Sequence, residues 1–310
     1  MTAGERPTTP DMTPTLAPTF EGRPLANPDE PIFDQGLAFD VGTLLDRRRV
    51  LKLMGWSGLG AGLVGIVGCA PSASSTPGAA SASAGSAAAS GGAATAGTDC
   101  ATVIPEETAG PFPGDGSNGP DVLTQSGVVR KDIRSSFGTS SGTAQGVPLT
   151  IRLVLQNASN GCAPLAGGAV YVWHCDREGR YSLYSQGATD QNYLRGVQEA
   201  GSDGIVTFAS IFPACYSGRW PHIHFEVYAS LTKATDNASK LATSQIALPA
   251  DVCSTVYATD GYGQSIANLS QVSLKTDGVF GDDGGVHELG TVTGSVQAGY
   301  TVELAVPVKA

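Results

Sequence analysis

The chain has 310 residues and carries a formal net charge of −10 at pH 7, from 28 acidic and 18 basic residues. Apart from three consecutive arginines near the N-terminus it has no basic patch, which excludes nucleic acid as an expected partner. The length allows one large domain or two modest ones, but the composition is uneven. Only the segment from Cys100 onward has the amino-acid usage of a globular protein.

The N-terminal 69 residues have the layout of an export signal. Residues 1–45 form a Pro- and Thr-rich extension that is expected to be disordered. In residues 46–69, three arginines precede an apolar run of about 15 residues, which is short for a membrane-spanning helix, and Cys69 follows. This order resembles a twin-arginine signal with a lipobox, which would make Cys69 the lipid-anchored first residue of the mature protein. The alternative is an uncleaved N-terminal anchor helix; both place the following domain outside the cytoplasmic membrane of a bacterium.

A tract of Ala, Ser, Gly and Thr over residues 70–99 separates the signal from the globular part. Ordering this tract would cost backbone entropy without burying apolar side chains, so we expect a flexible linker. Five cysteines follow Cys69, an odd number for an oxidising compartment, and none has the paired spacing of a zinc site. We therefore expect one or two disulfides and a leftover thiol.

Residues 100–310 are expected to form one all-β domain. Short runs in this segment alternate apolar and polar residues with period two, between Gly, Asn, Asp and Pro. The runs are residues 149–155, 167–175, 204–210, 222–228 and 302–308. Because each half-buried sheet needs a partner face, they predict an antiparallel two-sheet β-sandwich with long loops. Little helix is expected, limited to a turn near Pro249–Tyr257.

Two of the four histidines form the sequence His222-Ile223-His224 inside one of these runs. Positions i and i+2 of a strand point to the same face, so both imidazoles can reach one ion while Ile223 packs against the opposite face. The pattern alone favours a metal site and a hydrogen-bonded pair of core histidines about equally.

Tyrosines and an arginine lie close to this pair in the sequence. Residues 213–224 read PACYSGRWPHIH, and residues 173–182 read WHCDREGRYS. From Cys100 to the C-terminus the chain resembles the intradiol ring-cleavage dioxygenases, specifically their small exported bacterial branch. The resemblance includes residues 108–112 (TAGPF), 130–133 (RKDI) and 193–198 (YLRGVQ).

The resemblance implies a non-haem Fe(III) centre and names its residues. The implied iron ligands are Tyr181, Tyr216, His222 and His224. Arg219 would be the active-site cation, Gln245 would face the substrate, and Pro111 would belong to the pocket wall. The short spacing between Tyr216 and the histidines means that substrate preference does not transfer from the better-known cytoplasmic catechol enzymes.

The charge of this ligand set suits ferric iron. Two phenolates and two neutral imidazoles leave a net charge of about +1 on Fe(III), and phenolate is a hard anionic donor. The implied reaction inserts O2 between the two hydroxylated carbons of a catechol and gives a muconate-type dicarboxylic acid. Arg219 would stabilise the negative charge that develops on the ring and on the attacking oxygen.

Other interpretations of these residues stand beside this one. A tyrosine after a turn is commonly only a packed aromatic residue, and the domain could be a non-catalytic exported lipoprotein that binds a metal or ligand. A centre with copper or zinc is a further alternative. We expect His174 to be structural and His287 to lie in a solvated loop. Cys175 and Cys215 should be turned away from iron or oxidised, because a thiolate would reduce it.

Overall fold

The computed structural model describes residues 19–20, 23–24 and 102–310. Strands β1 (Thr19–Phe20) and β2 (Arg23–Pro24) form a two-residue antiparallel pair. The export signal with Cys69 and the linker over residues 70–99 lie outside the described residues, so both remain predictions. Among the described residues, no helix is long and apolar enough to cross a membrane.

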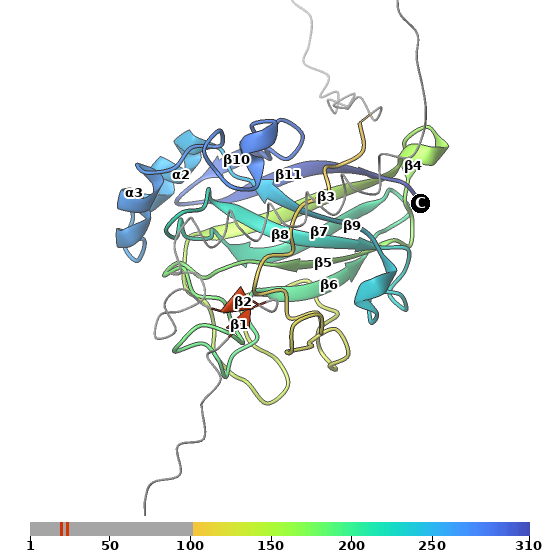
Figure 1. The fold of residues 1–310 in the computed structure, drawn as a ribbon, viewed down its shortest axis with the longest axis horizontal. Coiled ribbons are helices and arrows are strands. Elements are labelled where there is room, and N and C mark those ends of the chain that lie inside the picture. Colours follow the sequence, from red (N-terminus) through yellow and green to blue (C-terminus); the bar gives the residue numbers. More distant parts are fainter. Residues whose placement is uncertain (1–18, 21–22, 25–101) are drawn as a thin grey trace, which may run out of the picture. The chain divides into compact units, whose positions relative to one another are not determined.

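The first sheet of residues 102–310 has five strands (Figure 1). They are β3 (Pro148–Asn157), β4 (Ala163–Pro164), β7 (Ile205–Ile211), β10 (Thr291–Ser295) and β11 (Gly299–Val308). The order is β10-β11-β3-β4, and β7 pairs with β3 beside β4. All pairs in this sheet are antiparallel except β11 with β3, which is parallel.

The second sheet has four strands in the order β6-β5-β8-β9, all antiparallel. They are β5 (Ala169–Trp173), β6 (Arg195–Glu199), β8 (His222–Tyr228) and β9 (Lys240–Ala247). Each of the five predicted runs is confirmed as a strand, whereas β6, β9 and β10 were not predicted. Their sequences are small or polar, so they lack the alternation that identified the others.

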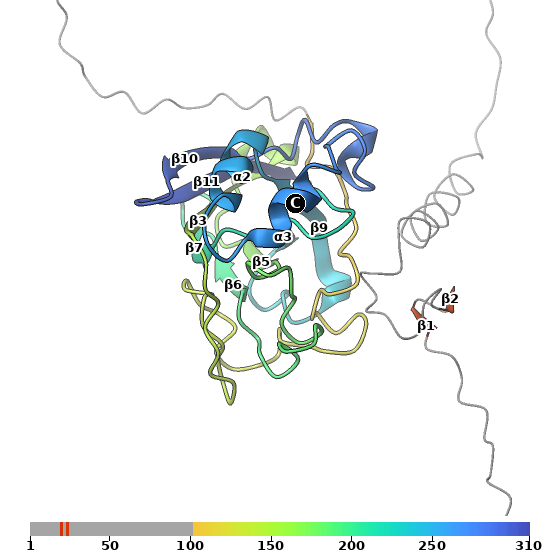
Figure 2. The same cartoon turned by 90° about the vertical axis from the view of Figure 1, so that its left-hand side faces the viewer.

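Helix is scarce, as expected. Helix α2 (Ala250–Tyr257) occupies the segment where one turn was predicted, and α3 (Gly263–Leu269) was not predicted because Ser265 is its only buried residue. Figures 1 and 2 show both helices together at one end of the sheets. Three short 3-10 turns complete the helical part of the described chain: η2 (Ala158–Asn160), η3 (Asn237–Ser239) and η4 (Phe280–Asp282).

The two sheets pack face to face around an apolar core, as the sandwich prediction requires. Alternate residues of β3 are buried, from Leu149 to Leu155. They share one hydrophobic cluster with the inward residues of the second sheet. From the second sheet these are Val170, Val172, Ile223, Phe225, Val227, Ala242 and Ile246. We call this side of the four-stranded sheet its inner face.

The other side of the four-stranded sheet, its outer face, is also buried. Tyr171 and Trp173 of β5 join a second cluster with Phe112, Val128 and Tyr181, which come from the loops before β3 and after β5. One row of paired residues crosses this face from β6 to β9. In order it is Arg195, Trp173, His224 and Gln245. The loops therefore cover a face that carries polar and aromatic side chains.

One disulfide reaches the described domain. Cys162 is disulfide-bonded, and its partner lies outside the described residues because Cys175, Cys215 and Cys253 are free. All three free thiols are buried. The expectation of a single leftover thiol was therefore too low, since three thiols remain in the described part of the chain.

Candidate metal centre

Four side chains converge on the outer face at the end of β8. The Nε2 atom of His222 lies 3.4 Å from the Tyr181 hydroxyl, 3.2 Å from the Tyr216 hydroxyl and 3.1 Å from Nε2 of His224. Ligand atoms about 2.1 Å from a shared ion, at angles between octahedral and tetrahedral, lie about 3.0–3.4 Å apart. The three distances from Nε2 of His222 thus match the spacing within one ligand set.

The hydrogen bonding of His222 shows that a cation fits this point. Its Nδ1 lies 2.5 Å from the Trp220 carbonyl, which can only accept, so the proton sits on Nδ1 and Nε2 presents a lone pair. One lone pair cannot satisfy two phenol hydroxyls and a second imidazole at once, whereas a cation among them can. Between residues 102 and 310, no three His, Cys, Asp or Glu side chains are grouped to hold a metal.

Burial sets the charge of the four groups when no cation is present. It raises the pKa of Tyr181 well above the usual value of a phenol and raises that of Tyr216 as well. It lowers the pKa of His222 and of His224 well below the usual value of an imidazole. All four side chains are then neutral at pH 7. A metal ion must displace the phenol protons, so its affinity should increase with pH.

Local sequence places the two tyrosines. Tyr181 follows a turn closed by Asp176, whose Oδ1 accepts from the backbone N–H groups of Glu178 and Arg180. Gly179 in this turn has φ +86°, and a Cβ there would lie 3.3 Å from Cβ of Tyr216. The glycine therefore allows the turn to adopt its conformation and lets the two tyrosine segments approach each other.

Arg219 lies beside the four side chains, with Nη1 3.5 Å from Nε2 of His222. Its Nε donates to Asp277 at 3.0 Å, and its Nη2 donates to Oε1 of Gln245 at 2.7 Å. Burial acts to lower the pKa of Arg219, but the Asp277 carboxylate, followed by the Tyr216 phenol, raises it above its usual value. Arg219 is thus a permanent cation at the edge of the centre.

Asp277 is a site residue that the sequence analysis missed. Its Oδ2 also accepts from the backbone N–H of Trp220 at 2.6 Å, and the Trp220 carbonyl holds His222. Its Oδ1 accepts from the backbone of Val279 and Phe280. Asp277 is separated from Arg219 by 58 positions, and no pattern around it distinguishes it from other loop aspartates.

Gln245 and the segment that contains Pro111 both lie next to His224. Gln245 is fully buried and pairs with His224 across β8 and β9. Its Oε1 accepts from Arg219 and its Nε2 donates to the Thr108 carbonyl at 2.9 Å, so its amide bonds to protein groups at both ends. Pro111 is half-buried and follows Gly110, where a Cβ would lie 3.3 Å from Cε1 of His224. The structure thus groups the predicted ligands with Arg219 and Gln245 and places Pro111 next to Gly110, which approaches His224. It does not describe Cys69.

His174 and the thiols of Cys175 and Cys215 make their hydrogen bonds to groups other than the four side chains. His174 is buried between Ser210 and the Cys175 carbonyl, and burial lowers its pKa to about 4. His287 is exposed. The thiols of Cys175 and Cys215 contact the carbonyls of Ala214 and Arg219, at 3.7 and 3.5 Å. Each therefore has a structural partner of its own.

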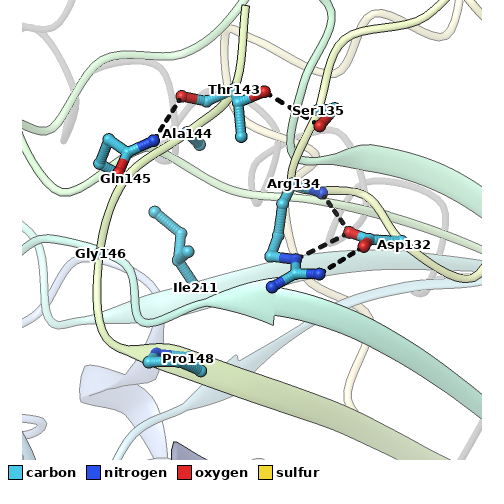
Figure 3. Close-up of a pocket in the computed structure, with 9 residues that line it drawn as sticks. All are labelled: Asp132, Arg134, Ser135, Thr143, Ala144, Gln145, Gly146, Pro148 and Ile211. Carbon is cyan, nitrogen blue, oxygen red and sulfur yellow. Dashed lines mark hydrogen bonds and ion pairs between the residues drawn. The ribbon is translucent and has the colours of Figure 1, made fainter.

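A pocket of about 330 Å³ lies elsewhere, on the five-stranded sheet (Figure 3). Pro148 and Ile211 line it from the sheet, while Arg134 and Asp132 form an ion pair on one side and Gln145 lies on the other. It contains none of the predicted site residues.

Comparison with known proteins agrees with this geometry. A family model described as Dioxygenase matches residues 118–251, which include both tyrosines and both histidines of the centre. Chlorocatechol 1,2-dioxygenase of Rhodococcus opacus is 40% identical over 53 residues, which are 17% of this chain and 21% of that protein. The chain thus matches only about a fifth of that relative's length.

A solved structure has the same fold. The intradiol ring-cleavage dioxygenase from Tetranychus urticae superposes with a TM-score of 0.54 at 22% identity, over 67% of this chain and 95% of that one. The family match lies on this β-sandwich and spans the convergent tyrosines and histidines. The family model and the shared fold make this chain similar to the intradiol ring-cleavage dioxygenases.

Proposed function

We propose that this chain is a non-haem Fe(III)-dependent dioxygenase that opens catechol-type rings between the two hydroxylated carbons. O2 is the second substrate, and a muconate-type dicarboxylic acid is the product. The observation that carries the proposal is the convergence of two phenols and two imidazoles on one point. The catechol class of the substrate is supported by the relative that acts on chlorocatechol.

The donor set favours ferric iron over other ions. Tyr181 and Tyr216 would bind as phenolates, which are hard anionic donors, and His222 and His224 as neutral imidazoles. When bound, Fe(III) would act as a Lewis acid that holds the catecholate and makes its ring reactive toward O2. The two negative charges of the phenolates are what distinguish this set from the neutral or thiolate-rich sets that zinc and copper prefer.

The chain itself supplies a base for the catechol protons. Tyr216 is partly exposed, whereas Tyr181 is 2% exposed and packs against Phe112 with ring centroids 5.0 Å apart. Tyr216 is therefore freer to move than Tyr181. A Tyr216 phenolate that leaves the metal would be a strong base for a proton of the entering catechol, because burial raises the pKa of the metal-free phenol.

Arg219 supplies a fixed positive charge at the same point. The guanidinium is held by Asp277 on one side and by Gln245 on the other, so it keeps its position while negative charge develops on the substrate. A preorganised cation in a site that excludes water stabilises such charge far better than a mobile one.

Colour and oxygen uptake test this proposal together. Tyrosinate-to-iron charge transfer should make the purified ferric protein burgundy, and a chelator-treated sample is the control. We expect O2 consumption with a panel of catechols, and product absorbance distinguishes cleavage between the hydroxyls from cleavage beside them. A colourless iron-loaded protein, or zinc or copper as the metal after growth in iron-replete medium, would contradict the proposal.

We also propose that the domain is exported and anchored by a lipid at Cys69. Support comes from the arginine run, the short apolar segment and the cysteine that follows it, together with the disulfide at Cys162, which suits an oxidising compartment. Cells expressing the wild-type chain should incorporate labelled fatty acid into it and retain it in the membrane fraction. The Cys69→Ala variant should lose the label, and label retained by that variant would refute the anchor.

A further inference from the structure

The two imidazoles of the centre are held in different ways. His222 is fixed by the hydrogen bond from its Nδ1 to the Trp220 carbonyl. Nδ1 of His224 is buried and has no hydrogen-bond partner among the described residues. Histidines that bind metals usually donate their second ring nitrogen to an acceptor, which sets the orientation of the ring. His224 therefore needs another source of orientation.

Trp173 provides a planar surface against His224. The two residues pair directly between β5 and β8, and their rings stack with centroids 4.8 Å apart and planes only 4° from parallel. Trp173 is fully buried, and its Nε1 has no hydrogen-bond partner among the described residues. Its interaction with the centre is therefore made by the ring face and not by its polar atom.

Two neighbours support the stack, one through a ring face and one at a ring edge. Tyr171 stacks on Trp173 with centroids 5.0 Å apart, and its hydroxyl is tied to the Pro113 carbonyl and to Arg195. Gly110 approaches the edge of the His224 ring, where a Cβ would come within 3.3 Å of Cε1. The imidazole thus lies parallel to the indole, with its Nε2 3.1 Å from Nε2 of His222.

We propose that Trp173 is the positioning residue of His224, its stacked ring taking the place of the missing hydrogen bond. The stack fixes the plane of the His224 imidazole. Rotation of the ring within that plane would be set by a bound metal. A pre-ordered ring loses less rotational freedom when it binds the ion, so the stack should increase metal affinity. The identity of the metal rests on the proposed function, whereas the stack itself does not.

Metal affinity in Trp173 variants tests the proposal. Loss of an orienting group typically weakens metal binding by about 10–100-fold, which is the effect expected for Trp173→Leu in chelator competition. Trp173→Phe keeps a smaller aromatic face and should lose about 3–10-fold on the same scale. Phe208→Leu, which removes a buried ring from the core of the other sheet, is the matched control and should bind metal as the wild type does.

A double-mutant cycle separates positioning from general loss of stability. If Trp173 acts through His224, Trp173→Leu should change affinity by less than about 2-fold in a His224→Ala background, because the partner is already gone. The full effect should persist in a His222→Ala background. An equal loss in both backgrounds, or the same loss in Phe208→Leu, would overturn the proposal. If Trp173→Leu does not fold, the same double-mutant cycle can be measured with Trp173→Phe.

Two further measurements make the result independent of the iron chemistry. The affinities are determined with Fe(III) and with Zn(II), so a chain without ring-cleaving activity still tests the role of Trp173. In the metal-free protein, NMR should show the His224 ring protons shifted by the indole ring current in the wild type and not in Trp173→Leu. Unshifted His224 protons in the wild type would contradict the stack itself.

Discussion

The inner and outer faces of the four-stranded sheet are equally buried but chemically different. On β8, Ile223, Phe225 and Val227 enter the core between the sheets, while His222 and His224 alternate with them on the outer face. All seven residues of the strand are buried. Burial on the inner face excludes water from apolar side chains, whereas burial on the outer face removes water from groups that then require specific partners.

This difference shows what each face determines. Inner residues should set stability through the volume they fill, while the outer residues should set activity through the atoms they present. Two results would contradict this comparison. One is a substitution on the inner face that abolishes catalytic activity in a protein that still folds. The other is a substitution of a proposed ligand on the outer face that leaves catalytic activity intact.

The largest effect is expected for Tyr216→Phe on the outer side. Removing one member of a group that acts as a unit should lower the turnover rate by at least about 10⁴-fold and abolish or strongly shift the visible band. Oxygen uptake with catechol and the absorption spectrum measure both. Urea unfolding of the metal-free variant should match the wild type within about 1 kcal/mol, since only a hydroxyl is lost. Retained turnover would show that Tyr216 is not a ligand.

Phe225→Ala makes the opposite change on the inner face of the same strand. Truncating a fully buried phenylalanine should lower the free energy of unfolding by about 3–5 kcal/mol because a cavity remains. Activity per folded molecule should stay close to that of the wild type. Urea denaturation together with active-site titration by bound iron separates the two quantities. A loss of activity per iron as large as that of Tyr216→Phe would break the comparison.

Asp277→Asn tests a residue that is not a proposed iron ligand and that contacts Arg219 and the backbone of Trp220. The amide keeps the size of the side chain but removes the charge beside Arg219 and one acceptor for two N–H donors. We expect a fall of about 10–100-fold in kcat/KM, with a shift of the iron absorption band as the Trp220 carbonyl and His222 move. Asp115→Asn, which removes a buried carboxylate paired with Lys240, is the matched control.

That control variant should lose stability and keep the spectrum. If Asp115→Asn shifts the absorption band as much as Asp277→Asn does, the shift is a general effect of losing a buried carboxylate, and Asp277 has no specific role in positioning Arg219 and His222.

The smallest effect concerns pH. Burial, followed by the charge of Glu107, raises the pKa of Glu288 to about 8, and burial raises that of Glu226 to about 7. From the usual carboxyl pKa of 4.5 up to these values, the folded protein binds more protons than the unfolded chain, so its stability falls as pH rises. Between pH 7 and 8 the fall due to Glu288 should be about 1 kcal/mol.

Urea unfolding at a series of pH values measures this slope. Glu288→Gln should flatten it between pH 7 and 8, and Glu226→Gln should flatten it mainly below pH 7. Because the inner face contains no carboxylate, Phe225→Ala should keep the wild-type slope. An unchanged slope in Glu288→Gln would show that this carboxylate ionises freely in the folded protein.

Much of the fold could be predicted because burial on one face gives a strand a period of two. The run from Leu149 to Leu155 and the run from His222 to Tyr228 both show it, and both are strands. The sequence of β10 does not show it, because the strand is mostly exposed and only Val292 of its residues packs against the core. The parallel pairing of β11 with β3 is set by packing between distant segments, which no local pattern contains.

The site divides in the same way. The spacing of His222 and His224 places both on one face by strand geometry alone, whereas Tyr181 and Tyr216 were assigned by family resemblance. Asp277 and Trp173 were not assigned any role. Each acts through a partner from another segment, Asp277 through Arg219 and Trp173 through its neighbour across β5 and β8. Such roles depend on tertiary contacts that the local sequence does not encode.

The position of β11 has a consequence for how the chain is made. This ten-residue strand, the last one, lies between β10 and β3 and is therefore internal to its sheet. Its partner β3 begins about 150 positions earlier in the chain, at Pro148. The larger sheet cannot close until a ribosome has released residues 299–308, so we expect this sheet to form after the rest of the domain has been synthesised. Deletion of residues 299–310 should leave a product that is degraded, even though it retains every proposed ligand.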